Sequence, residues 1–411
     1  MGPERSGAPA GPSAGVGPAG HPVRVLVFTG KGGVGKTTTA AATALQLAAT
    51  GHRVVVTSAD PAHSLADAFE RPLGSEPTEV APGCDAQQLD ARRRLEETWG
   101  EVRDWLLEVL DWAGVGSVEA EELAVVPGLD EVVALAELED LCAGGRYDVV
   151  LVDCAPTAET IRLLSLPDVL SWYMERVFPA SRRLNRMVGP VLGRLTDLPV
   201  AGDAVFSAGR RFYDRLDAVH RVLADPLRTS VRLVVTPERM VVAESRRTHT
   251  YLSLFGYQVD AVVVNRVLPD EVSDPWFDRW RRSQSGHLAA VEEAFAGLPV
   301  LRAELAPDEV VGIPALGRMG SALWEGRDPA KAQVAGRPLR LESDGDDLVL
   351  SLELPNVERG EVEVDRLSDE LIVTVGPLRR TLVLPDSLRR REVGAAALRD
   401  GTLRVRFPAG T

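Results

Sequence analysis

Lysine is among the residue types that this 411-residue sequence has least of. Only three lysines occur, at positions 31, 36 and 331, among 46 Lys and Arg residues. A bias toward GC-rich codons explains such a deficit without a functional cause, yet two of the three fall within eight consecutive residues. A compact ammonium group fits a cradle of backbone amides around a phosphate, whereas a planar guanidinium does not. The scarcity of lysine therefore directs attention to the segment that begins at Gly30.

Other absences argue against whole classes of protein. No run of eighteen apolar residues occurs, so no transmembrane segment is predicted. Residues 1–22 are mostly Gly, Ala, Pro and Ser and lack the apolar centre of a signal peptide, so a disordered leader is predicted there. The net charge of −14 and an isoelectric point of about 5.1 give a surface that repels phosphate backbones, so no nucleic-acid partner is expected.

Cysteine is also scarce. Cys84, Cys142 and Cys154 form no close pair in the sequence, which argues against a disulfide framework and against a zinc site. This usage fits a reducing compartment, and a cytoplasmic location is therefore predicted.

The segment from Gly30 to Thr37 reads GKGGVGKT and satisfies the spacing G-x-x-x-x-G-K-T of a phosphate-binding loop. An apolar run precedes it and an alanine-rich helical pattern follows it, which is the context that the motif requires. Lys36 is predicted to reach the β- and γ-phosphates of ATP, and the Thr37 hydroxyl is predicted to bind Mg²⁺. The predicted nucleotide-binding residues of this segment are Gly30, Lys31, Gly32, Gly33, Val34, Gly35, Lys36, Thr37 and Thr38.

Five apolar runs predict the strands of a mostly parallel sheet. They lie at 23–28, 53–57, 148–152, 231–235 and 261–265, with helical stretches between them. Continuous apolar strands are typical of a sheet covered by helices on both faces, so residues 23–324 are predicted to form an α/β P-loop NTPase with a helical subdomain. Functional residues of such sheets gather at the carboxyl ends of the strands. Asp60, after the second run, is predicted to orient the attacking water, and Asp153, after the third, to support Mg²⁺ through a water molecule.

The apolar pattern changes its period after Trp324. A polar linker, 325–337, leads to short, largely alternating runs at 348–354, 361–364, 371–375, 380–384 and 403–407. Turn residues separate these runs, so a small all-β sandwich is predicted over residues 338–408.

Four segments in order carry a resemblance to a known family. They are GKGGVGKT at 30–37, DPAHSLADAF at 60–69, DCAPTAETIRLL at 153–164 and VVNRV at 263–267. Together they resemble the arsenite-pump ATPases and the targeting ATPases for tail-anchored membrane proteins. The resemblance implies an Mg²⁺-dependent homodimeric ATPase with ATP near the subunit interface. It further implies that Lys31 reaches the nucleotide of the other subunit, that Asp60 activates water, that Asp153 begins the second nucleotide switch and that Asn265 recognises adenine.

The sequence departs from that family at two places. Ala158 and Glu159 stand where the family commonly has Gly and His, which narrows the backbone freedom of the second switch. The Cys-x-x-Cys pair that joins subunits of targeting ATPases through zinc is missing, so a dimer is expected to form without that metal. Apolar faces within 99–110 and 184–195 correspond to the client groove of targeting ATPases, and ordinary packing against the core is the alternative.

The predicted β region resembles another family. LPNV at 354–357 and ALRDGTLRV at 397–405 resemble the α-crystallin domain of small heat-shock proteins. The strand-exchange loop of those proteins has no room between 375 and 380, and no Ile-x-Ile tail follows Phe407. The expectation is an appended binding or regulatory module that does not drive large oligomers.

Three functions remain open on the sequence alone. The first is an ATPase whose nucleotide state controls binding of a client, such as a hydrophobic or membrane-protein segment. The second is the ATPase subunit of an arsenite pump, although a soft metalloid needs clustered thiolates and the strand at 148–152 separates Cys142 from Cys154. The third is a positioning ATPase of the Min or Par type, which the acidic charge disfavours because those proteins use basic surfaces or tails.

Overall fold

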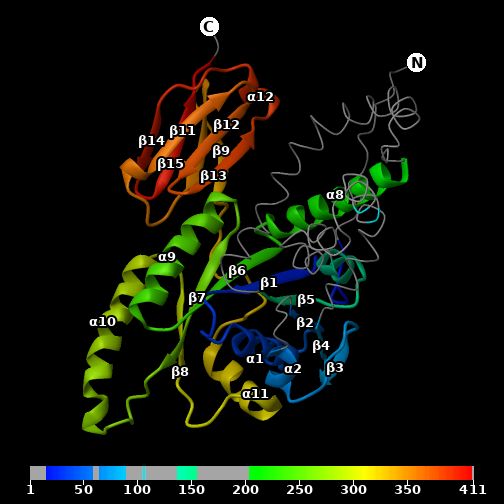
Figure 1. The fold of residues 1–411 in the computed structure, drawn as a ribbon, viewed down its shortest axis with the longest axis vertical. Coiled ribbons are helices and arrows are strands. Elements are labelled where there is room, and N and C mark those ends of the chain that lie inside the picture. Colours follow the sequence, from blue (N-terminus) through cyan, green and yellow to red (C-terminus); the bar gives the residue numbers. More distant parts are fainter. Residues whose placement is uncertain are drawn as a thin grey trace.

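The computed structural model describes residues 15–58, 64–88, 104, 107, 137–154 and 203–409. Within these ranges one central sheet has the strand order β3-β4-β2-β5-β1-β6-β7-β8 (Figure 1). Neighbouring strands are parallel except for β3, which pairs antiparallel with β4. The strands are β1 (Arg24–Thr29), β2 (Val54–Ser58), β3 (Thr78–Ala81), β4 (Cys84–Gln88), β5 (Val149–Asp153), β6 (Thr229–Val235), β7 (Val259–Val267) and β8 (Val300–Glu304). The predicted α/β class with a mostly parallel sheet is confirmed.

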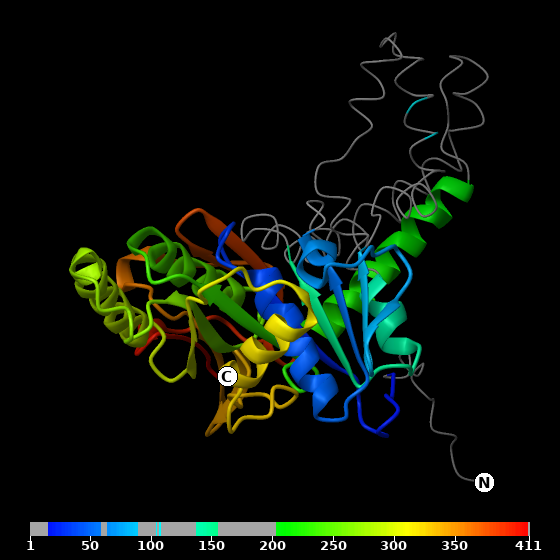
Figure 2. The ribbon, with the colours of Figure 1, turned by 90° about the horizontal axis from the view of Figure 1, so that it is seen from below.

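Helices of the described ranges surround this sheet. They are α1 (Lys36–Ala49), α2 (Ser64–Phe69), α8 (Asp203–Leu223), α9 (Arg239–Leu254), α10 (Asp278–Ala294) and α11 (Gly312–Leu323). Figure 2 shows α1 and α11 side by side, and Gly320 permits this approach because an added Cβ would lie 2.2 Å from the carbonyl oxygen of Ala42. Among the helices of the described ranges, none has the length and apolar character that a membrane span requires.

The predicted linker lies along the core rather than apart from it. Arg232, fully buried in β6, has its guanidinium 4.4 Å from the centre of the Trp324 ring and pairs with buried Asp260 at 3.5 Å. Main-chain groups of the linker bind side chains of the sheet: Pro329 O accepts from Arg232 at 2.5 Å, Ala330 O from Arg24 at 2.9 Å, and Gln333 N donates to Asp260 at 3.0 Å. Residues 325–333 are therefore fixed to the sheet by hydrogen bonds that a flexible linker would not make.

The described end of the predicted leader is ordered. Gly17 N donates to His21 O at 2.9 Å, and Ala19 N donates to Asp148 Oδ1 at 2.8 Å. Val16 and Pro22 also form a β-bridge. The prediction of a disordered leader over residues 1–22 is thus wrong for residues 15–22, whose glycines form a tight turn against the start of β5. Residues 1–14 lie outside the described part of the chain.

The C-terminal strands form two antiparallel sheets, in the orders β14-β15-β10-β9 and β11-β12-β13. Their bounds are β9 (Leu339–Asp344), β10 (Asp347–Glu353), β11 (Val362–Leu367), β12 (Glu370–Val375), β13 (Leu378–Val383), β14 (Ala396–Arg399) and β15 (Thr402–Phe407), with the short helix α12 (Asp386–Arg389) after β13. Leu352, Leu403 and Phe407 of one sheet and Leu371 and Val373 of the other are buried. The predicted all-β sandwich is confirmed, and Figure 1 shows it beyond the C-terminal end of α9.

Several predicted features lie outside the described residues. They are Asp60, the second-switch residues Ala158 and Glu159, and the residues of the apolar faces within 99–110 and 184–195. The domain boundaries at 23, 324 and 338 stay predictions.

Candidate active site

The GKGGVGKT segment lies at the carboxyl edge of the sheet, between β1 and α1. Gly30 passes so close to β6 that an added Cβ would lie 2.2 Å from the carbonyl oxygen of Val234. Gly35 has a φ of 93° and is the N-cap of α1, so the loop turns directly into the positive end of that helix. Gly32 and Gly33 are exposed, and Thr38 lies half-buried in the first turn of α1. The glycines at 30 and 35 are therefore required by close approach and by a left-handed backbone, respectively.

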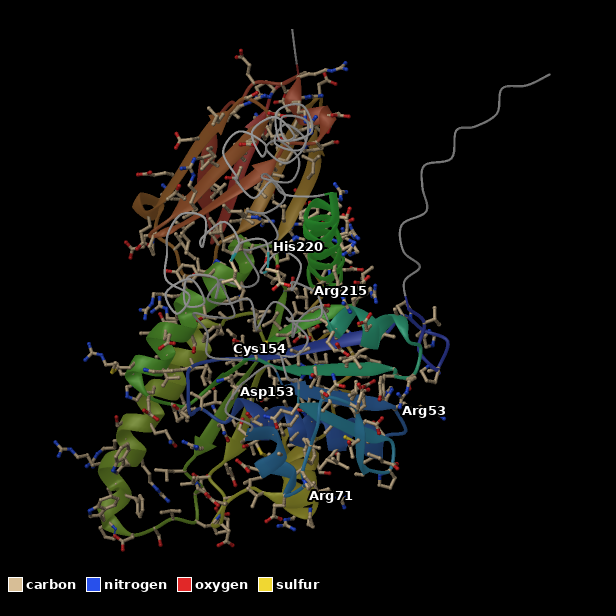
Figure 3. The ribbon with its side chains drawn as sticks, turned by 45° about the vertical axis from the view of Figure 1, so that its right-hand side comes forward. Arg53, Arg71, Asp153, Cys154, Arg215 and His220 are labelled. Carbon is tan, nitrogen blue, oxygen red and sulfur yellow. The ribbon has the colours of Figure 1, made fainter. Side chains whose placement is uncertain are left out.

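Four oxygen-bearing side chains meet beside this loop. The hydroxyl of Thr37 donates to Asp153 Oδ2 at 2.7 Å and lies 3.1 Å from the hydroxyl of Ser64 at the start of α2. Ser58 at the end of β2 donates to the same carboxylate oxygen at 3.3 Å. The register aligns Ser58 and Phe28 with Asp153, which explains why the three strand ends meet (Figure 3). The predicted pair of Thr37 and Asp153 is thus brought together by the fold.

The two loop lysines have different surroundings. Lys36 is buried, with an exposed fraction of 6%, and its Nζ donates to the carbonyl oxygen of Lys31 at 3.3 Å. Lys31 keeps 35% of its side chain exposed and forms an ion pair, Nζ to Oε2 of Glu244, at 3.5 Å. Lys36 therefore points into the curl of the loop, whereas Lys31 points away from it toward α9.

Asn265 in β7 contacts the loop directly. Its Nδ2 donates to Val34 O at 2.9 Å and lies 2.2 Å from where a Cβ on Gly35 would be. Its Oδ1 accepts from Arg266 N at 2.9 Å. Asn265 is thus at the nucleotide loop, as its predicted role requires, and its amide holds the loop; recognition of adenine stays a prediction.

A pocket of about 290 Å³ adjoins the loop. It is lined by loop residues 31–34, by Thr236 and Glu238 after β6, and by residues 239–241 at the start of α9. The Thr236 hydroxyl donates to Glu238 Oε1 at 3.0 Å, which fixes the carboxylate at the pocket wall. The pocket places the first turn of α9 beside the phosphate loop.

Sequence reasoning missed several residues of this site. Ser58 ends an apolar strand next to Asp153, and its position at a strand end was a usable signal. Ser64 stands within the DPAHSLADAF segment but was assigned no role. No sequence pattern indicates that Glu244 belongs to the site, because a glutamate within a helix is ordinarily a solvated surface residue.

The cysteines are buried rather than gathered at the site. Burial, helped by neighbouring Asp85, raises the pKa of the Cys84 thiol to about 12, and burial raises that of Cys142 to about 11. Cys154 is buried directly after Asp153, and Figure 3 shows the two at the end of β5. Within the described ranges, no group of three His, Cys, Asp or Glu side chains is placed to hold a metal ion. Thiolate chemistry is therefore disfavoured at Cys84 and Cys142.

Comparison with known proteins extends this picture. Residues 23–325 match the family described as anion-transporting ATPase, and residues 345–407 match an HSP20-like domain found in ArsA. A protein of Aquifex aeolicus named "Putative arsenical pump-driving ATPase 1" is 35% identical over 380 residues, which cover 90% of this chain and 96% of that protein. The ATPase ASNA1 homolog of Trypanosoma cruzi is 30% identical over 73% of this chain and 90% of its own length. ATPase GET3C of Arabidopsis thaliana is 28% identical over 74% of this chain and 82% of its own length.

The family match includes the phosphate loop, the strand end at Asp153 and Asn265. The resemblance drawn from the sequence motifs is thereby confirmed, and so is the HSP20-like nature of the β sandwich. The loop and the oxygens around it lie within the part of the chain that matches this ATPase family. This chain belongs to the ArsA family of anion-transporting ATPases.

Proposed function

We propose that this ATPase works as an Mg²⁺-dependent homodimer whose nucleotide state controls the binding of a hydrophobic or membrane-protein client. The observation that carries the proposal is the arrangement of the two loop lysines. Lys36 serves the nucleotide of its own loop, while Lys31 points outward from a loop that needs only one lysine to hold phosphate. A second, outward lysine suits a nucleotide held near a subunit interface.

The oxygen cluster at Thr37 fits Mg²⁺. This cation prefers hard oxygen ligands and usually takes one or two protein ligands, with waters and phosphate oxygens completing its shell. The hydroxyl of Thr37 and the buried carboxylate of Asp153 are 2.7 Å apart and supply such ligands. Bound there, Mg²⁺ would neutralise charge on the β- and γ-phosphates. Thr37 would hold the ion directly, and Asp153 would hold it through water.

Two observations favour a client over a metalloid as the cargo. The thiols of Cys84 and Cys142 are buried with raised pKa values, and a soft metalloid needs accessible thiolates. The HSP20-like sandwich also adds strand edges of the kind that can bind an extended segment. The arsenite-pump function remains the second candidate, because the Aquifex relative is named for it and is matched by this chain over nearly its whole length.

The test is to trap the ATP-bound state and identify its cargo. Asp60→Asn should keep ATP binding and lose turnover, since it removes only the group predicted to orient water. Lys36→Ala is the matched control, because it should lose nucleotide binding. Membrane-protein segments that copurify with Asp60→Asn in ATP, and not with Lys36→Ala, support the proposal. Copurification of a membrane efflux channel, or turnover stimulated several-fold by arsenite and lost on substitution of single cysteines, would replace it with the pump function.

A further inference from the structure

One helix joins the nucleotide site to the HSP20-like sandwich. The first residues of α9, 239–241, line the pocket beside the phosphate loop. One turn further on, Glu244 pairs with Lys31 at 3.5 Å. The helix has 16 residues and is therefore about 24 Å long. The C-terminal end of α9 contacts the sandwich, as Figure 1 shows.

The contacts with the sandwich repeat along one face of α9. Arg246 Nε donates to Asn356 Oδ1 at 3.2 Å, and the Thr250 hydroxyl donates to Pro355 O at 2.5 Å. Leu254 O, at the last residue of the helix, accepts from Arg380 Nη1. Positions 246, 250 and 254 are four residues apart, so they share a face of the helix. The sandwich therefore contacts the C-terminal half of α9 through hydrogen bonds to three successive turns.

Arg380 of the sandwich contacts the C-terminal end of α9. It lies in β13, and its guanidinium is 5.9 Å from the centre of the Phe255 ring, just after the helix ends. Gly256 follows with a φ of 87°, and a Cβ there would lie 3.5 Å from Arg380 Nη1. Arg380 is 7% exposed, so its charge is enclosed where α9 ends. An enclosed arginine bound to a main-chain carbonyl fixes direction as well as distance, which makes the junction stiff.

The Lys31–Glu244 pair competes with nucleotide for the same ammonium group. A lysine paired with a carboxylate has its charge partly neutralised and its ammonium group turned toward α9, so the pair opposes its reach toward phosphate oxygens. The pair is half-exposed, so its strength is modest and adjustable. Because α9 is a continuous helix, a shift of its C-terminal half moves Glu244 relative to the loop.

We propose that Glu244 is a positioning residue that restrains Lys31, and that the HSP20-like sandwich sets this restraint through α9. With the sandwich seated on residues 246–254, Glu244 holds Lys31 away from nucleotide. Loosening of the sandwich relaxes α9 and releases Lys31. The sandwich is thereby a regulator of ATP turnover and not only an appendage. This inference rests on the proposed role of Lys31 at the nucleotide.

The test is a double-mutant cycle on the full chain, read as kcat/KM for ATP. Thr250→Val removes the hydroxyl that contacts Pro355 O and, within the helix, Arg246 O, with almost no change of shape. Glu244→Gln removes the charge that holds Lys31. Each should raise kcat/KM about two- to five-fold, the range expected for a half-exposed ion pair. The double variant should show no more than the effect of Glu244→Gln alone, since both act through one pair. Arg406→Gln, which breaks an ion pair with Asp344 inside the sandwich, is the matched control and should leave kcat/KM unchanged.

Salt provides a readout that a merely structural role would not move. The ratio of kcat/KM between Glu244→Gln and the unchanged chain should fall toward one as ionic strength rises, because salt screens the pair. If Thr250→Val does not fold, Arg246→Gln at the exposed contact with Asn356 takes its place. Effects that multiply in the double variant, or a Thr250→Val that matches Arg406→Gln, would overturn the coupling. Unchanged turnover in Lys31→Ala would instead refute the role of Lys31, so the two failures are distinguishable.

Discussion

His249 in α9 gives a residue-scale test of the fold. Its ring lies 5.6 Å from that of Phe295, and burial lowers its pKa from 6.5 to about 4. The folded chain therefore binds fewer protons at this residue than the unfolded chain between those values. The titration of His249 therefore leaves the free energy of unfolding unchanged above pH 6.5. As the pH falls from 6.5 toward 4, this titration lowers the free energy of unfolding by at most about 1.4 kcal/mol per pH unit.

The measurement is the free energy of unfolding in denaturant between pH 4 and pH 7.5. Comparison with His249→Gln isolates the histidine, because glutamine is neutral throughout. The two curves should differ in slope below pH 6.5 and run parallel above it. Equal slopes across the whole range would show that His249 titrates normally in the folded chain.

The close packing of α1 and α11 gives a test at the scale of secondary-structure elements. An added Cβ on Gly320 would lie 2.2 Å from Ala42 O, whereas one on Gly317 would meet nothing within 4 Å. Gly320→Ala should lower the free energy of unfolding by about 1–3 kcal/mol, since the helices must separate. Gly317→Ala is the matched control in the same helix and should be neutral or stabilising by up to about 1 kcal/mol, from helix propensity. A Gly320→Ala chain as stable as Gly317→Ala would contradict the packing.

The strands show which elements a sequence pattern can predict. All five runs of the ATPase region proved to be strands because each is a continuous apolar segment in the interior of the sheet. Two strands of this sheet illustrate what is missed. β4 reads CDAQQ and buries Gln87 and Gln88, so its polar composition hides a buried strand. β8 lies at the edge of the sheet and alternates as VLRAE over only five residues.

Site residues are easier to predict when they lie close together in the sequence than when only folding brings them together. Lys36 and Thr37 belong to one contiguous motif, and Asp153 follows from the rule that strand ends meet, so the sequence alone places these three at one edge of the sheet, while their roles at a nucleotide stay predictions. Glu244 lies 213 positions beyond Lys31 along the chain, and only the packing of α9 brings the two together. The order of residues 15–22 was missed for a similar reason, since it depends on contacts with Asp148.

At the scale of the whole molecule, the proposed dimer makes Lys31 testable by mixing subunits. Lys31→Ala and Lys36→Ala chains should each be inactive alone. If Lys31 acts on the partner's nucleotide, a mixed dimer retains one complete site, composed of Lys36 from one chain and Lys31 from the other. Random pairing of equal amounts should then restore about a quarter of normal turnover in a two-fold dimer. The measurement is ATP turnover after co-refolding, with mixed dimers verified by two affinity tags. Verified mixed dimers without turnover would show that Lys31 does not act across the interface.

The sandwich gives the last test, a cut at Gly336 between the two parts of the chain. The segment before the cut stays bound to the sheet through Pro329, Ala330 and Gln333, so the core should keep its fold. The described contacts between sandwich and α9 include hydrogen bonds at Arg246, Thr250 and Leu254, and the cut removes the covalent tether, so that only such contacts hold the sandwich on the core. A protease site inserted at Gly336 allows the same preparation to be compared before and after cleavage. Cleavage should leave residues 1–336 with a cooperative thermal transition and raise turnover about two- to five-fold, as for a released ion pair.

The alternative is that the sandwich only covers apolar surface near Leu254 and Phe255, in which case the cleaved core would precipitate or lose its thermal transition. The two outcomes differ in solubility as well as in rate, so the experiment separates a regulatory module from a cap.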